Sequence, residues 1–178
     1  MANNTKHKSH TTASNVMRDF AGLLLLFLSL FTFLALLSHH SMDPSFFTST
    51  TQPARNLAGK IGSHWSAFLL QSVGAAAFLV GALFLLAGVA LFRRVSRTEW
   101  FLALLNYVFL LLSATALLGI AGSPLTLGGS RFAMGGLLGS FTGEALHSQL
   151  NTAGAVLLTL CLTVFAVSLS TRVSVRNL

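Results

Sequence analysis

Long runs of apolar residues alternate with short polar segments along this chain of 178 residues. Four runs stand out, at residues 20–37, 65–92, 101–121 and 152–169, and none contains Asp, Glu, Lys, Arg or His. A run of about 18 or more apolar residues is long enough to cross the hydrocarbon core of a bilayer as a helix. A helix also satisfies its own backbone hydrogen bonds, which lipid cannot do. The pattern predicts an all-α integral membrane four-helix bundle.

The polar segments divide the rest of the chain. Residues 1–19 are polar and lack apolar periodicity, which predicts a flexible tail. Residues 20–171 form the membrane domain, and residues 172–178 begin a linker. Phe132–Leu150 is too polar and too rich in glycine for a fifth span, so we expect a short helix that is interfacial or re-entrant. The run at residues 65–92 exceeds the length needed to cross, so it is tilted or begins in the interface.

Basic residues predict the orientation of the spans. Of the 11 lysines and arginines, eight flank the runs on one side: Lys6, Lys8, Arg18, Arg93, Arg94, Arg97, Arg172 and Arg176. The other three, Arg55, Lys60 and Arg131, fall in the two opposite connections. The positive-inside bias makes the richer side cytoplasmic, so both termini are predicted to be cytoplasmic. A fifth span would place Arg172 and Arg176 outside.

The first run resembles a signal peptide because it follows basic residues, but it is longer than a signal core of about 7–15 residues. Its exit, from Ala35 to His40, lacks a clear cleavage site of the small-x-small type. We expect an uncleaved anchor.

Composition excludes several classes of function. Charged residues make up 8% of the chain, against about 25% in a soluble domain. The four runs and their connections also occupy residues 20–171, so a separate soluble domain has no room here. The net charge of +7 is spread over short segments, which indicates topology and contact with anionic lipid rather than DNA binding. The spans lack ionisable side chains that coupled transport usually needs. No phosphate-binding loop, zinc-protease or serine-hydrolase motif is present, so we predict no enzymatic activity.

Candidate metal ligands are few. Cys161 is the single cysteine and lies within the fourth run, where a packing role is expected. His39, His40, His64 and His147 all fall on the predicted outer side. Imidazole suits several transition metals, but these histidines lie in loops or at helix ends rather than within facing helices. We therefore predict no metal and no cofactor.

Glycines suggest where helices approach closely. Gly74, Gly81 and Gly88 recur every seven residues, which places them near one face of a helix. Small residues on one face allow another backbone to approach within a membrane, so we predict a packing seam. The alternative is that glycine is simply common in membrane helices.

The outer connections hold the least generic surface, and they supply the candidate interaction residues. In the first connection these are Asp43 and Pro44, which form a turn signal, with Phe46 and Phe47 directly after them. In the second they are Gly135, Gly139 and Gly143, at four-residue spacing.

Several of these elements, in this order, resemble the amino-terminal four-helix membrane domain of bacterial FtsK/SpoIIIE-type DNA translocases. The first is Ser41-Met-Asp-Pro-Ser-Phe46 after the first span; the next is Asn56-Leu-Ala-Gly59 with Gly62 before the second. A basic inner loop, Gly135-Gly-Leu-Leu-Gly139 and Gly154 complete the pattern. The resemblance covers residues 18 to 172. The family continues into a linker and an ATPase motor, whereas this sequence stops at Leu178, so we expect an excised domain rather than a stand-alone paralogue.

The resemblance implies a membrane anchor and septal scaffold for a motor that pumps DNA in chromosome segregation and cell division. It implies a location in the bacterial inner membrane with enrichment at the septum, and contact with the lipid bilayer and with other division-site membrane proteins. It also implies a homo-oligomer, which is a hexamer if the motor sets the number. Two other hypotheses remain open. A small transport or channel subunit would show an open polar pathway, and a redox subunit with haem on the outer histidines would absorb visible light.

Overall fold

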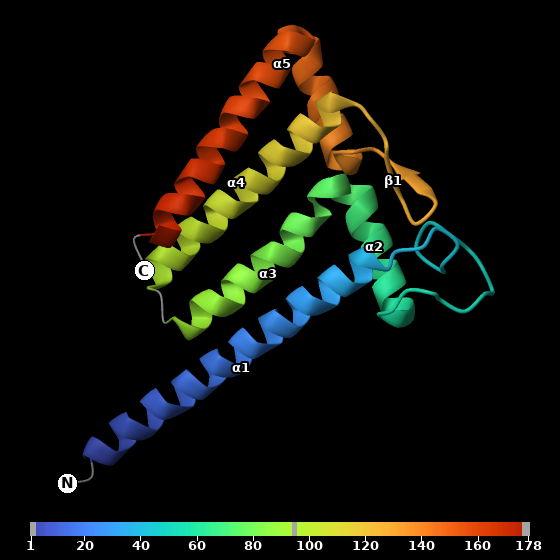
Figure 1. The fold of residues 1–178 in the computed structure, drawn as a ribbon. Coiled ribbons are helices and arrows are strands. Elements are labelled where there is room, and N and C mark those ends of the chain that lie inside the picture. The colour runs from blue at the N-terminus through green and yellow to red at the C-terminus, as the bar shows by residue number, and fades with distance from the viewer. Residues whose placement is uncertain (1–2, 94–95, 176–178) are drawn as a thin grey trace.

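The computed structural model describes residues 3–93 and 96–175. Four long helices run side by side: α1 (Asn3–Leu37), α3 (Ala77–Phe92), α4 (Arg97–Ala121) and most of α5 (Gly136–Val175), as Figure 1 shows. The shorter elements are α2 (Gly59–Val73), the single 3-10 turn η1 (Gly74–Ala76) and the strands β1 (Leu125–Leu127) and β2 (Ser130–Phe132). Within the described residues, four helical stretches are long and apolar enough to span a membrane, at residues 15–37, 59–92, 98–120 and 136–169. The predicted all-α membrane fold is confirmed.

Both ends of the chain lie at one end of the long helices (Figure 1). The connections after α1 and after α4, together with α2 and the strands, gather at the opposite end (Figure 1). We call this second region the cap and define it as residues 38–76 and 122–151.

The first helix is longer than its apolar run. The sequence predicted a flexible tail over residues 1–19, but α1 begins at Asn3 and continues without interruption to Leu37. Adding a residue to an existing helix costs far less than nucleating a new one, so the span can propagate its helix into the polar segment. Residues 1 and 2 lie outside the described part of the chain.

The second apolar run is not one helix, which corrects the single span expected over residues 65–92. Helix α2 ends at Val73, Gly74 adopts a φ of 61°, and α3 begins at Ala77. The amide of Ala75 donates to the carbonyl of Met134 at 2.8 Å, outside any helical hydrogen-bond pattern. Helix α3 runs with the other long helices, whereas α2 turns away across the cap (Figure 1).

Helix α5 consists of two arms, residues 136–150 and 152–175, separated by Asn151 with a φ of 57°. The Asn151 side-chain oxygen accepts the amide of Thr152 at 2.9 Å at the start of the second arm. The first arm lies beside the cap end of α4, and the second arm returns along α4 (Figure 1). The second arm contains the predicted fourth span and extends through residue 175 into the predicted linker, of which residues 176–178 are not described.

The predicted loop after α4 contains an antiparallel hairpin instead. Leu125 pairs with Phe132 and Leu127 pairs with Ser130 across a turn formed by Gly128 and Gly129. Both turn glycines have positive φ, at 56° and 85°, which is the conformation that tight two-residue hairpins favour. The sequence segment expected to begin at Phe132 therefore starts with the end of a strand.

The spans pack as two pairs, α1 with α3 and α4 with α5. The pairs are linked by the hydroxyl of Tyr107, which donates to the carbonyl of Leu79 at 2.7 Å. Within the second pair, the side-chain amide of Asn106 donates to the carbonyl of Ala166 at 3.3 Å. Tyr107 and Asn106 thus bond to a neighbouring helix. The hydroxyls of Ser113, Thr115 and Thr159 instead bond to carbonyls of their own helices.

The contiguous apolar core lies at the cap end. Its buried members come from the end of α1 and from α2, η1 and the start of α3: Leu36, Leu69, Leu70, Val73, Ala76 and Ala77. Lipid replaces protein around the remaining length of the spans, where most large apolar side chains are exposed. The cap is therefore the part of the molecule that is packed like a soluble protein.

Candidate functional site

Asp43 closes the first connection of the cap. Its two carboxylate oxygens accept the backbone amides of Arg55 and Asn56, both at 2.8 Å. The side chain is 3% exposed. The predicted interaction residue therefore holds residues 44–54 as a closed loop, and both of its carboxylate oxygens are bonded within the chain.

Asn56 joins this loop to the first span. Its side-chain amide donates to the carbonyl of Ala35 at 2.8 Å, and its side-chain oxygen accepts the amide of Ala58 at 2.9 Å. The carbonyl of Ala35 is one of the last four in α1, which have no partner within the helix, so Asn56 caps that end. The hydroxyl of Ser38 accepts the amide of Leu57 at 3.0 Å and adds a second link.

Two glycines make the approach of the loop to α2 possible. Gly59 has a φ of 68°, a conformation that a side chain disfavours, and its amide donates to the carbonyl of Asn56 at 2.8 Å. A Cβ at Gly62 would lie 2.6 Å from the side-chain oxygen of Asn56. The Asn56–Gly59 element and the Asp43–Pro44 element thus form one unit, in which the hydroxyl of Ser63 also donates to the carbonyl of Pro44 at 2.7 Å.

His39 connects three parts of the cap. The Nδ1 of His39 forms a hydrogen bond of 3.0 Å with the hydroxyl of Ser66, which also lies 3.2 Å from the carbonyl oxygen of Ser63. The ring packs edge-on against Phe132 of β2, with centroids 5.4 Å apart. Nε2 is buried without a hydrogen-bond partner among the described residues.

Burial lowers the pKa of His39 below 6.5, the nearby charge of Asp43 opposes that shift, and His40 adds to it. The neutral ring is therefore the form that fits the folded cap.

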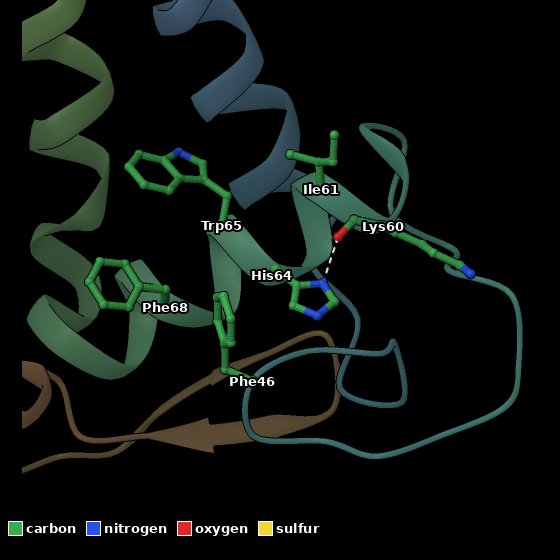
Figure 2. Close-up of a pocket in the computed structure, with 6 residues that line it drawn as sticks. All are labelled: Phe46, Lys60, Ile61, His64, Trp65 and Phe68. Atoms are coloured by element: carbon green, nitrogen blue, oxygen red, sulfur yellow. Dashed lines mark hydrogen bonds between the residues drawn. The ribbon is translucent and has the colours of Figure 1, made fainter.

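The predicted pair of phenylalanines is exposed. Phe46 and Phe47 are 72% and 58% exposed at the surface of the closed loop. Phe46 packs edge-on against His64 of α2, with ring centroids 4.9 Å apart. The rings of Phe46 and His64 line an open groove along α2, together with Lys60, Ile61, Trp65 and Phe68 (Figure 2).

The glycines of the second connection are buried against α4. A Cβ at Gly135 or Gly139 would collide with the carbonyl oxygen of Thr115, and one at Gly143 would lie 3.3 Å from Ile120. In return, a Cβ at Gly119 would collide with the carbonyl group of Gly139. These three predicted interaction residues form a helix-packing seam within the chain, so their backbone is not open to a partner.

The other predicted glycines are not on one helix face. Gly81 lies against the ring of Phe33, and Gly88 lies against Gly22 and Leu26, so both contact α1. The hydroxyl of Ser29 also donates to the carbonyl of Gly81 at 2.8 Å. Gly74 instead lies in the break before α3, where a Cβ would collide with the carbonyl of Met134.

Among the described residues, no group of three or more His, Cys, Asp or Glu side chains is placed to hold a metal ion. His39 contacts Ser66 and Phe132, and His64 contacts Phe46 and the carbonyl of Lys60. The arrangement offers contacts that close the chain on itself and an exposed apolar groove.

The family model for the 4TM region of DNA translocase FtsK/SpoIIIE matches residues 14–178. The chain belongs to this family. A curated relative, "DNA translocase FtsK" of Pseudomonas putida strain KT2440, is 29% identical over 154 residues, which cover 83% of this chain and 18% of the relative. The chain thus spans about a fifth of that relative's length. No solved structure matches.

Membership in the FtsK/SpoIIIE 4TM family confirms the resemblance noted from the motifs. The structure adds that two of these motifs meet in the cap, where the carboxylate of Asp43 accepts the amide of Asn56. A third, the Gly135–Gly139 element, also lies in the cap, where Gly136 contacts Gly74. Sequence reasoning missed several residues that belong to the cap or contact it: Thr32, Ser38, Ser66, Thr115 and Gly119. The hairpin had a usable signal, since a Gly-Gly pair between Leu-Thr-Leu and Ser-Arg-Phe is typical of one.

Proposed function

We propose that this chain is the membrane anchor and septal scaffold of a DNA translocase that acts in cell division and chromosome segregation. The observation that carries the proposal is the family match over residues 14–178 together with four candidate spans. In this role the chain has no catalytic activity and no direct contact with DNA. It holds a motor at the inner membrane, oligomerises with the motor, as a hexamer if the motor sets the number, and presents the cap to other division-site membrane proteins.

The proposed orientation places both termini in the cytoplasm. It is supported by the eight basic residues that flank the spans on one side and by the two chain ends at one end of the helices (Figure 1). Single cysteines in a Cys161→Ala background test it with an impermeant thiol reagent in intact cells. Cysteines at Ser9 and Ser174 should be protected, and one at Ser49 should be labelled. Labelling of Ser9 from outside would reverse the orientation.

The scaffold role rests on the exposed loop of the cap. Asp43 and Asn56 fix that loop by hydrogen bonds, so Phe46 and Phe47 are presented on a defined backbone. Large exposed aromatic side chains beside a polar rim are typical of interaction surfaces. We expect a fluorescent fusion of residues 1–178 to concentrate at the septum without any motor.

The variant Phe46→Ser with Phe47→Ser should weaken septal localisation while the amount of protein in the membrane fraction stays unchanged. Phe47→Ser alone tests the loop surface without altering the groove, because Phe47 does not line the groove. Leu57→Ser is the matched control, since Leu57 is 74% exposed in the same connection. An even distribution of the parent fusion around the cell envelope would leave a passive anchor and refute the scaffold.

A further inference from the structure

Helix α2 is apolar on two opposite faces. One face is buried against the rest of the cap and contains Ala67, Leu69, Leu70 and Val73. The other contains Ile61, Trp65 and Phe68, which are spaced by three and four residues and therefore form one stripe. Ile61 and Phe68 are 76% and 46% exposed. A helix with this pattern is typical of the membrane interface, because water would be an unfavourable neighbour for the second face.

The position of Trp65 sets the depth of this stripe. Its indole N–H donates to the hydroxyl of Thr32 in α1 at 3.1 Å. Thr32 precedes the end of α1 at Leu37 by five residues, so it lies roughly 7 Å below the end of the helix. Indole rings concentrate at the headgroup level of bilayers. The Trp65 end of the groove therefore meets the acyl chains near the boundary of the hydrocarbon core.

The groove has a polar end as well. Figure 2 shows the rings of Trp65 and Phe68 at one end, while the side chain of Lys60 extends away from them at the other. The Nδ1 of His64 donates to the carbonyl of Lys60 at 2.8 Å, and the ring of Phe46 forms the wall opposite α2. The order along the groove, from apolar rings to an ammonium group, matches a phospholipid from its acyl chain to its phosphate.

We infer that this groove binds an anionic phospholipid, with one acyl chain along Ile61, Trp65 and Phe68 and the headgroup phosphate at Lys60. The ammonium supplies the charge complementarity, and the long apolar stem of lysine lets it reach the headgroup. The inference does not depend on which leaflet contains the cap or on septal localisation. It concerns a bound lipid, whereas the scaffold role concerns a protein partner at Phe46 and Phe47, of which only Phe46 lines the groove.

The chain contains two tryptophans, Trp65 and Trp100, so Trp100→Phe leaves Trp65 as the single fluorescent reporter inside the groove. This variant is reconstituted in two sets of phosphatidylcholine vesicles. One set contains brominated phosphatidylglycerol, and the other contains the same fraction of brominated phosphatidylcholine. Bromine quenches a nearby indole, so the ratio of the two quenching levels reports lipid preference. One lysine near a headgroup predicts a preference for phosphatidylglycerol of about fivefold.

Lys60→Gln in this background should bring the preference close to one, because it removes the cation and keeps the stem. Arg55→Gln is the matched control: Arg55 is an exposed cation of the same connection that does not line the groove, and its removal should leave the preference intact. Equal quenching by the two lipids in the parent would overturn the inference in favour of ordinary boundary lipid. If neither lipid quenched Trp65, protein would fill the groove. If Lys60→Gln and Arg55→Gln reduced the lipid preference equally, the preference would come from general surface charge. Either result overturns the proposed lipid site.

Discussion

The contact between the first arm of α5 and α4 depends on the missing side chain of Gly119. A Cβ there would collide with the carbonyl carbon and oxygen of Gly139 and lie 2.9 Å from its Cα. All three atoms belong to the main chain, so no rotation of a side chain relieves the collision. Gly119→Ala must therefore push the first arm away from α4.

The expected cost follows from these contacts. Ordinary carbon contacts lie at about 3.5–4.0 Å, so the two backbones must separate by roughly 1 Å. Overpacking of this kind costs about 1–3 kcal/mol. Gly143→Ala is the matched control, because its Cβ would lie 3.3 Å from a side-chain atom of Ile120 and 3.5 Å from the carbonyl carbon of Gly119. Both variants gain the same helix propensity, about 1 kcal/mol, which cancels in their difference.

Unfolding in mixed micelles with increasing dodecyl sulfate, followed by tryptophan fluorescence, measures the free energy of unfolding of each variant. We expect Gly119→Ala to be less stable than Gly143→Ala by about 1–3 kcal/mol. Equal stabilities would show that the first arm does not lie against α4 and would refute the packing described for the predicted interfacial segment.

Three further predictions follow from other contacts. Gly81→Leu should destabilise the pair of α1 and α3 by about 1–3 kcal/mol, because a Cβ there already lies 3.1 Å from the ring of Phe33; an unchanged unfolding midpoint would contradict that contact. Asp43→Ala leaves the part-buried amide of Arg55 and the buried amide of Asn56 without acceptors and should cost about 1–3 kcal/mol, with faster proteolysis within residues 44–54 and intact spans; unchanged proteolysis would argue against the closed loop. Because burial lowers the pKa of His39, the folded state binds protons less readily than the unfolded state, so stability should be constant well above pH 6.5 and fall as the pH drops through the lowered pKa. In His39→Gln this part of the pH dependence should vanish, and its persistence would assign it to another group.

Much of the fold is determined by local sequence. Length and apolar composition identify the spans, because a helix forms its backbone hydrogen bonds within its own segment. A helix surrounded by lipid also needs no specific neighbouring residue. The first, third and fourth runs accordingly lie within α1, α4 and the second arm of α5. The order of the motifs, such as Asp43-Pro44-Ser45 and Asn56-Leu57-Ala58-Gly59, was sufficient to indicate the family.

The conformation of the cap depends on contacts between residues far apart in the sequence. The break at Gly74 depends on the backbone of Met134 and Gly136, and the buried state of Asp43 depends on amides 12 and 13 residues later. Gly135, Gly139 and Gly143 have the spacing of a packing seam, but only the position of Gly119 shows that the seam is used within the chain. Hydropathy and spacing report the environment of a residue and the face it occupies, whereas its partner is set by how the chain returns on itself. The sequence by itself therefore determined which segments cross the membrane, and the tertiary structure decided which glycines and polar groups meet and which apolar surface remains exposed.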